Sequence, residues 1–388
     1  MHIDYTDSQR KLRAELREYF GALIKPEYKE TLRNAEGGDL YKSLIRQMGS
    51  DGMLALGWPT EYGGKGLTTI EQLMFFEEAL LAGAPVPFVT LNTVGPAIMD
   101  HGSEEQKARF LPDIAAGKLH FSIGYSEPSA GTDLAALQTA AVKQGDEYIV
   151  NGSKVFTSAA EAADYVFLAC RTDSEVAKHK GISILCVDTS DPGFSFGPIH
   201  TVGSVRTNVS YYSDVKVPAN MIIGKENEGW RLITSQLNHE RVGLAAWGIH
   251  GWKLFERTLE WAREEHNGLR AIDNPSTQRS LAEVYAYLEA MRVMNANMAW
   301  QLDQAEISPV LPSALKVYST EILIEICRIL MDIVGPNALI AAPSDGNVMI
   351  GDLEHEYRRA LINTFGGGVV EVLRGLVATF GLGMPRHR

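Results

Sequence analysis

Two short stretches decide the fold: Tyr125–Asp133, which reads YSEPSAGTD, and Asn151–Ser158, which reads NGSKVFTS. The first follows an expected strand. Its small hydroxyl residues and glycine leave backbone N–H groups exposed for an anionic or heteroaromatic ligand. The second opens with Asn-Gly, the signal of a two-residue hairpin turn, and continues as a strand rich in aromatic and hydroxyl residues. On composition alone, the first stretch is a hydrated loop and the second is only a hairpin.

A β-rich segment surrounds both stretches and extends from about Leu119 to Pro218. It consists of short runs of β-branched and aromatic residues, separated by clusters of Gly, Asp, Asn and Pro. The runs expected to form strands are 119–125, 148–150, 165–170, 182–187 and 209–217. This pattern predicts a compact antiparallel β domain with a barrel-like or sandwich-like form.

Helical patterns flank the β segment on both sides. On the N-terminal side, capping boxes of the form S/T-x-x-E/Q mark helix starts at Thr6, Thr68 and Ser103. On the C-terminal side, long amphipathic segments joined by short loops satisfy the requirements of a four-helix bundle. They cover roughly 228–265, 277–304, 315–334 and 354–382. We therefore predict an α+β fold with an N-terminal helical domain (1–117), a middle antiparallel β domain (118–225) and a C-terminal four-helix bundle (226–388).

Composition restricts the classes of function. Lys and Arg total 36 and Asp and Glu total 48, and the net charge of −12 argues against nucleic acid or an anionic membrane as the main partner. Cys170, Cys186 and Cys327 form no CxxC pair and no Cys/His ligand spacing, so neither a disulfide framework nor a metal site is expected. The N-terminal residues lack the apolar run of a signal peptide, and no apolar stretch reaches the roughly 20 residues of a membrane span. A cytoplasmic enzyme is the expectation.

The two stretches, in this order and within this domain pattern, resemble the acyl-CoA dehydrogenase family. Two further family-like marks are Gly57–Gly64 (GWPTEYGG) and Gly224–Trp230 (GKENEGW). Each motif is weak alone, but four in order along nearly the whole chain form a specific signal. The resemblance implies FAD as cofactor, an acyl-CoA thioester as substrate and an electron-transfer flavoprotein as electron acceptor. No G-x-G-x-x-G lies between a strand and a helix, so a Rossmann dinucleotide site is not expected.

The resemblance also assigns cofactor and substrate contacts to the first two stretches. Carried over by position, the residues that would hold FAD are Tyr125, Ser126, Gly131, Thr132, Phe156 and Ser158. Ser126 and Thr132 would also contact the substrate through its pantetheine. Phe156 replaces a tryptophan that usually stacks on the flavin, a mild departure because both offer an apolar face. Ser158 would hydrogen-bond near the flavin N5.

The general base is expected on a helix. Family members remove the α-proton of the thioester with a carboxylate while hydride leaves the β-carbon for flavin N5. Most place this glutamate before the last helix, where this chain has Gly367; a minority place it on the long helix that opens the C-terminal domain, where this chain has Glu240. A lone helical Glu–Arg pair would be an ordinary surface pair. Because no carboxylate stands at Gly367, the resemblance makes Glu240 the catalytic base, with Arg241 beside it in the substrate site and His239 structural.

The glycine run 366–368 bears on the substrate. In the family, the thioester carbonyl is bound by the flavin ribityl 2′-OH and by the backbone N–H at the position of Gly367, which requires no side chain. Gly366 and Gly367 are therefore assigned to the substrate site, and their small size favours a bulky acyl group, although glycines also cap helices. Runs 238–241 and 363–368 resemble actinobacterial dehydrogenase subunits that degrade steroid side chains, which implies a steroid-CoA thioester.

Two motifs that a neighbouring subunit normally contributes to each FAD site are altered. Where the family has Arg-x-x-Phe-Gly, this chain has Arg263–Gly268 (REEHNG), and where it has Gln-x-x-Gly-Gly-x-Gly, this chain has Asp332–Ala338 (DIVGPNA). An Asp beside a pyrophosphate repels it. The resemblance therefore implies a second homologous subunit and an α2β2 assembly. A homo-oligomer with substitute contacts, a non-catalytic FAD-binding scaffold subunit and an acyl-CoA oxidase are the alternatives.

Overall fold

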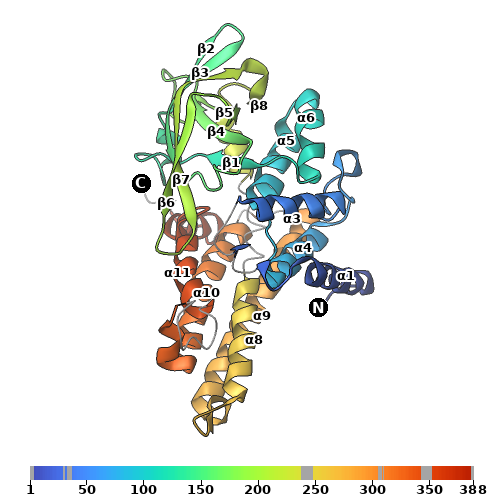
Figure 1. Cartoon of the computed structure of the whole chain (residues 1–388). Coiled ribbons are helices and arrows are strands. Elements are labelled where there is room, and N and C mark those ends of the chain that lie inside the picture. Colours follow the sequence, from blue (N-terminus) through green and yellow to red (C-terminus); the bar gives the residue numbers. More distant parts are fainter. Residues whose placement is uncertain are drawn as a thin grey trace.

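The computed structural model describes residues 4–28, 31–32, 37–236, 248–304, 308, 310–341 and 352–385. Within these ranges the chain forms helices, then a sheet, then helices again, which confirms the predicted fold class. Figure 1 shows the strands gathered at one end of the molecule and two long helices, α8 (Ile249–Arg263) and α9 (Pro275–Asp303), extending to the other.

The N-terminal helices begin where the sequence places their caps. Thr6, Thr68 and Ser103 each form a complete capping box, so these three predictions are confirmed. The caps satisfy N–H groups that the first helical turn leaves without partners. The helices are α1 (Asp7–Leu23), α3 (Asp39–Ser50), α4 (Thr69–Ala82), α5 (Gly95–His101) and α6 (Glu104–Ala115), with a π-helical turn, η2 (Thr90–Val94), before α5.

The middle of the chain is an eight-stranded sheet with the order β6-β7-β3-β2-β4-β5-β8, and β1 pairs with β4. Its strands are β1 (Phe121–Gly124), β2 (Ala140–Gln144), β3 (Glu147–Val155), β4 (Tyr165–Arg171), β5 (Ile182–Asp188), β6 (Phe194–His200), β7 (Arg206–Pro218) and β8 (Ile222–Ile223). All five predicted strands are present. The sheet is not purely antiparallel, however, because β1 runs parallel to β4. Residue alternation reports which face is buried but not the direction of the neighbouring strand.

The Asn151-Gly152 turn predicted from sequence is wrong. Both residues lie inside β3, and the turn between β2 and β3 is at Gly145 and Asp146. Asn151 and Gly152 instead mark a register shift in the pairing of β3 with β7. Gly152 has a φ of 149°, and a Cβ there would come within 2.6 Å of the Thr139 hydroxyl. The glycine thus permits a bulge and a close approach between strands, which are the other uses of glycine in a sheet.

The C-terminal part is helical but more interrupted than predicted. It begins with helical residues 229–236 and continues with α8, α9, α10 (Leu311–Val334), α11 (Asp352–Ala360) and α12 (Val370–Leu376). The predicted single segment 354–382 is broken between η7 (Leu361–Thr364) and α12. Gly367 and Gly368, with φ values of 70° and 109°, lie in this break and adopt a conformation that helical residues do not. A short hairpin, β9 (Glu265–His266) with β10 (Leu269–Arg270), also follows α8.

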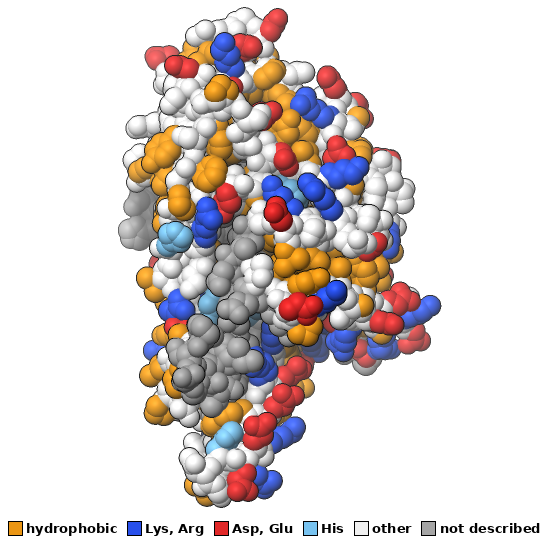
Figure 2. Space-filling model, viewed as in Figure 1, with side chains coloured by type: hydrophobic (Ala, Val, Ile, Leu, Met, Phe, Trp, Pro, Cys, Tyr) orange, Lys and Arg blue, Asp and Glu red, His pale blue; other side chains and the backbone are white. Residues whose placement is uncertain are grey.

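The outer surface shows no strong segregation of charge on the face in Figure 2, where acidic and basic side chains lie interspersed with hydrophobic ones. None of the helices within the described ranges combines the length and the hydropathy that a membrane span requires. The main core is continuous from the N-terminal helices to the sheet, and a second core lies between α8, α9, α10 and α11. The sheet is thus rigidly supported from the helices beside it.

Candidate active site

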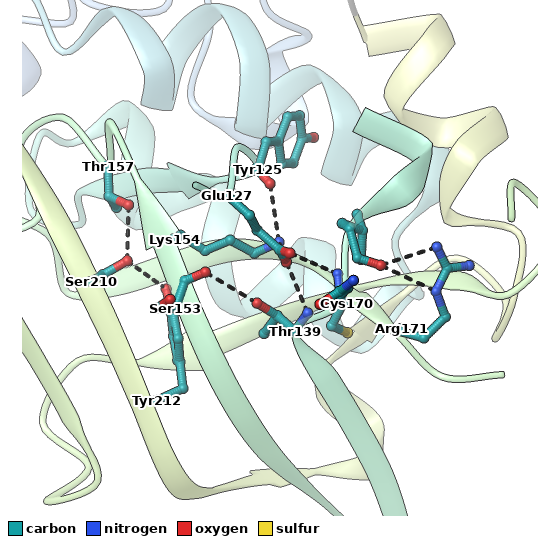
Figure 3. Close-up of polar contacts among 12 residues, drawn as sticks. Tyr125, Glu127, Thr139, Ser153, Lys154, Thr157, Cys170, Arg171, Ser210 and Tyr212 are labelled. Carbon is teal, nitrogen blue, oxygen red and sulfur yellow. Dashed lines mark hydrogen bonds and ion pairs between the residues drawn. The ribbon is translucent and has the colours of Figure 1, made fainter. Parts of the chain in front are cut away.

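The two stretches that decided the sequence analysis lie against each other. The loop that follows β1 runs beside the end of β3, and the N–H of Val155 donates to the carbonyl of Ser126 at 2.8 Å. Figure 3 shows Tyr125 and Glu127 from the loop beside Lys154 of β3, whereas Thr157, two residues after β3, lies next to Ser210 of β7. Two segments that are separate in the sequence therefore form one surface beside the C-terminal end of β3.

A buried ion pair joins these two stretches. Lys154 Nζ lies 2.7 Å from Glu127 Oε1 and donates to the Tyr125 carbonyl at 3.0 Å, and both charged side chains are at most 5% exposed (Figure 3). Glu127 also accepts from the backbone N–H groups of Gln138 and Thr139, at 2.7 and 2.8 Å. Burial alone would raise the pKa of Glu127, but the Lys154 ammonium and the hydrogen bonds from Thr139 together more than offset it, and the pKa lies below its usual value. The pair is satisfied internally, so its role is to hold the loop.

Phe156 presents its ring to the outside. Its φ of 61° lies in the left-handed region, which is strained for a residue with a bulky side chain, and the residue is 59% exposed. The next residue, Thr157, is fully buried and anchored by main-chain hydrogen bonding to Asn208 at 2.9 Å. Ser158 then lies 3.0 Å, hydroxyl to hydroxyl, from Thr207 on β7. The strain is localised where an aromatic face is exposed, a pattern associated with ligand sites.

Tyr125 connects the loop to the C-terminal domain. Its hydroxyl donates to Gln236, the last described residue of the helix that begins at residue 229. Glu240 and Arg241, the predicted base and its neighbour, lie outside the described residues. The described contact nevertheless brings the start of their segment to the loop that carries the predicted cofactor contacts.

The residues present fit FAD. Gly131 has open space on the side where a Cβ would stand, and Gly131 and Thr132 are both exposed. The exposed phenyl face of Phe156 and the hydroxyls of Ser126 and Ser158 offer a flat apolar surface beside hydrogen-bonding groups. A large planar heterocycle with polar edges requires such a combination. All six predicted FAD contacts therefore lie on two adjoining segments, and one of them, Tyr125, also contacts the helical domain through Gln236.

The glycine run is fixed from α10. Lys316, which is buried, donates from Nζ to the carbonyl oxygens of Asn363 at 2.7 Å and Gly366 at 2.8 Å. Within the described part of the chain, the N–H of Gly367 has no hydrogen-bond acceptor. This N–H is the group that the sequence assigned to the thioester carbonyl.

Sequence reasoning missed Glu127, Lys154, Gln236 and Lys316. A signal was available for two of them, because Glu127 and Lys154 are charged residues inside the two stretches that were otherwise assigned to ligand contacts. Their pairing across 27 positions depends on the strand register, which the sequence does not display. Lys316 lies in an ordinary amphipathic helix and carries no comparable signal.

A cavity of about 540 Å³ lies apart from these motifs, between α1, α4, α8 and α9. It contains the buried carboxylates Glu77 and Glu78, which accept from Arg13 at 2.6 and 2.7 Å. Burial raises the pKa of Glu77 although Arg13 opposes the shift. Because both carboxylates are held by an arginine of α1, this cluster is a structural ion-pair network that joins α1 to α4.

Helices, sheet and bundle in this order, with a candidate ligand surface beside the end of β3, define an oxidoreductase of the acyl-CoA dehydrogenase type. The N-terminal, middle and C-terminal domains of acyl-CoA dehydrogenases match residues 6–118, 122–215 and 227–382. The chain belongs to the acyl-CoA dehydrogenase family, whose members generally bind FAD.

Several relatives match along the whole chain. The acyl-CoA dehydrogenases FadE26 and FadE29 of Mycobacterium tuberculosis are each 48% identical over 100% of this chain and 99% of their own length. Among solved structures, the Tcur3481-Tcur3483 steroid ACAD has a TM-score of 0.95 and 48% identity, with full coverage of both chains. The ChsE4-ChsE5 complex from Mycobacterium tuberculosis has a TM-score of 0.94 and 48% identity, again with full coverage. These similarities place the chain beside dehydrogenases that include a steroid-type enzyme and a complex of two named chains.

Proposed function

We propose that this chain catalyses the FAD-dependent α,β-dehydrogenation of an acyl-CoA thioester, with Glu240 as the general base. One observation carries the assignment: Gly367 occupies the position at which most of the family has the catalytic carboxylate. Within the described ranges, the buried carboxylates Glu77, Glu78 and Glu127 are all paired with Arg or Lys. Glu77 and Glu78 line the cavity between α1, α4, α8 and α9, apart from the proposed cofactor loop. Glu127 is held by Lys154 and its pKa lies below the usual value, which makes it a poor proton acceptor. Glu240 is therefore the favoured base.

Each group in the site has a distinct task. Glu240 removes the proton from the α-carbon, and the N–H of Gly367 donates a hydrogen bond to the thioester carbonyl as negative charge develops on its oxygen. FAD, when bound, supplies the acceptor for the hydride that leaves the β-carbon. Ser126, Thr132 and Ser158 offer hydroxyls that orient substrate and cofactor. Phe156 offers an apolar face on which the flavin ring would stack. The product is the α,β-unsaturated thioester, and the two electrons pass on to an electron-transfer flavoprotein.

The proposed substrate is a steroid side-chain CoA thioester. The run Gly366–Gly368 removes side-chain bulk beside the proposed carbonyl contact. Similarity to a steroid ACAD over the full chain supports the same substrate class. Similarity to a two-chain complex supports a second homologous subunit.

The test is anaerobic bleaching of the flavin absorbance by saturated CoA thioesters, with mass spectrometry of the product. We expect bleaching together with the loss of two hydrogens from the acyl group. FAD binding without bleaching by straight-chain or steroid thioesters would identify a non-catalytic subunit. Rapid return of the absorbance on admission of air, with formation of hydrogen peroxide, would identify an oxidase instead.

A further inference from the structure

A buried lysine on α10 reaches the break between α11 and α12. Lys316 is 5% exposed, and its ammonium donates to two main-chain carbonyls, those of Asn363 and Gly366. Placing an ammonium group in the interior has a desolvation cost that a neutral side chain of the same length would not have. Cations do stabilise carbonyls at helix ends, so helix capping is one role for the contact. The Gly366 carbonyl points to a second role, because its peptide unit also carries the N–H of Gly367.

The carbonyl of Gly366 and the N–H of Gly367 belong to the same peptide unit. That unit is planar and trans, so its C=O and N–H point in opposite directions. Fixing the carbonyl oxygen at 2.8 Å from Lys316 Nζ therefore fixes the direction in which the Gly367 N–H points. A cation at the oxygen also polarises the peptide, which strengthens the N–H as a donor.

The glycines make such an anchor necessary. Gly367 and Gly368, at φ values of 70° and 109°, have no Cβ to restrict rotation of the peptides around them. A donor that stabilises developing charge must be held in place before the reaction, because reorientation during the reaction would add to the barrier. Lys316 provides the fixed point that the glycine run itself lacks.

We propose that Lys316 is a positioning residue for the thioester carbonyl, acting through the Gly366–Gly367 peptide. It orients and polarises the N–H that receives the carbonyl oxygen, and so it sets the strength of that hydrogen bond. This proposal rests on the proposed function, in which the Gly367 N–H is the carbonyl donor.

Four variants separate this role from helix capping. Lys316→Met removes the ammonium but keeps the length of the side chain, Lys316→Gln keeps a neutral donor, and Lys316→Arg keeps the charge. The matched control is Arg374→Gln. Arg374 joins α12 to the same helix α10 through Glu321 at 2.6 Å, but the pair is partly exposed and does not touch the glycine run.

The readout is the infrared carbonyl frequency of a bound product. The FAD-loaded protein is saturated with the α,β-unsaturated CoA thioester of 5β-cholanic acid, labelled with ¹³C at the carbonyl. We expect wild type, Lys316→Arg and Arg374→Gln to lower the carbonyl stretching frequency of the bound thioester relative to that of the free thioester. Lys316→Met should lose at least half of this shift, and Lys316→Gln should show an intermediate shift. The kcat of Lys316→Met should fall on the order of 10–100-fold, less than for deletion of a donor itself, with KM changed by less than about threefold.

A second measurement keeps the proposal testable if turnover is absent. The affinity ratio between the thioester and the matching thioether, which lacks the carbonyl oxygen, reports the carbonyl contact alone. A thioester-to-thioether affinity ratio that falls in Lys316→Met supports the proposal. This holds even if no saturated thioester reduces the flavin of the wild-type protein, because that result contradicts only the dehydrogenase function. If the wild-type protein is active, the proposal would be overturned by a folded Lys316→Met or Lys316→Gln variant in which both the carbonyl frequency shift and the affinity ratio are unchanged. A wild type without any carbonyl shift would overturn it together with the role of Gly367.

Discussion

At the scale of single residues, the position of one carboxylate decides the chemistry. Gly367 offers a backbone N–H but no side chain, and Glu240 offers a carboxylate ten residues after the end of the family-like segment Gly224–Trp230. The sequence predicted both assignments through resemblance, since no periodicity or spacing distinguishes a catalytic glutamate from a surface one. Glu240 lies outside the described residues, so its role stays a prediction.

Replacement of Glu240 by Gln tests this prediction. The amide keeps the size of the side chain but accepts no proton, so kcat should fall on the order of 10²–10⁴-fold. FAD content should not change, because the predicted FAD contacts lie on other segments. Steady-state turnover and the flavin spectrum measure the two effects. Glu260→Gln, an exposed position on α8, is the control, and full activity of Glu240→Gln would exclude Glu240 as the base.

Gly367→Tyr tests the width of the acyl pocket. The phenol ring would occupy the space that the glycine run leaves open, and kcat/KM for a steroid-CoA thioester should fall more than for octanoyl-CoA. Gly367→Ala is the control, because it shares the cost of a side chain at a φ of 70°, about 1–2 kcal/mol, without the bulk. If Gly367→Tyr lowers kcat/KM equally for both thioesters, and by as much as Gly367→Ala does, then backbone strain and not pocket width causes the loss of activity.

At the scale of elements, local signals were read correctly only where one segment determines the result. The capping boxes at Thr6, Thr68 and Ser103 depend on four consecutive residues and were confirmed. Asn151-Gly152 has the composition of a hairpin turn but serves as a bulge, because its conformation is determined by the pairing of β3 with β7 and by the close approach of Thr139, the residue before β2. The Glu127–Lys154 pair was missed for the same reason, since its two halves meet only through strand pairing.

The Glu127–Lys154 pair should stabilise the proposed cofactor loop. Lys154→Met leaves a buried carboxylate without its cation, which typically costs about 3–5 kcal/mol. The free energy of unfolding from urea titration measures this loss, and FAD affinity should fall with it. The control is Lys178→Gln, which breaks a 2.6 Å pair with Asp133 in which both side chains are about half exposed, and which should cost under about 1 kcal/mol. Equal losses in the two variants would contradict a special role for the buried pair.

The bundle contains a histidine that should make it sensitive to acid. Burial lowers the pKa of His250, on α8, from 6.5 to about 4, although Glu356 on α11 opposes the shift; Arg359, Lys253 and His355 also face it. Because the folded pKa is depressed, His250 contributes stability that is complete above pH 6.5 and is lost as the pH falls toward 4. The loss is at most about 3 kcal/mol.

His250→Gln should flatten this pH dependence. Urea unfolding across the interval from pH 6.5 to 4 measures the slope for both proteins. His200→Gln, at an exposed position on β6, is the control and should keep the wild-type slope. A slope that is the same in His250→Gln as in wild type would assign the acid sensitivity to other groups.

At the scale of the whole molecule, the order of helical, β and helical parts was predictable because each part has its own hydrophobic period. What the sequence did not reveal is how the outer face of the last part is covered. Six of the large exposed hydrophobic residues come from residues 361–384: Leu361, Phe365, Val372, Phe380, Leu382 and Met384. A contiguous patch of exposed apolar side chains is typical of a protein interface.

The hairpin after α8 bears on the identity of the partner. In the described structure, His266 of this hairpin stacks on Trp261 of the same chain, with ring centroids 4.5 Å apart, and its Nε2–H donates to the Trp261 carbonyl at 3.0 Å. The position at which family members present a phenylalanine to a neighbouring FAD site is therefore engaged within its own subunit. Asp332, at the other altered motif, lies at the end of α10 and would repel a pyrophosphate.

We therefore predict that this chain requires a homologous partner to complete its FAD site. Expressed alone, it should contain less than one FAD per chain, and co-expression with a homologous subunit that retains Arg-x-x-Phe-Gly should give an α2β2 assembly with one FAD per pair. Light scattering and flavin absorbance measure mass and stoichiometry.

The double variant His266→Phe/Asn267→Gly restores the motif in this chain and should raise its FAD content when it is expressed alone, because the arginine and the aromatic ring would then be supplied in trans by a second copy. A stable homotetramer of the unaltered chain, with one FAD per chain and full dehydrogenase activity, would show that substitute contacts hold the cofactor and that no partner is needed.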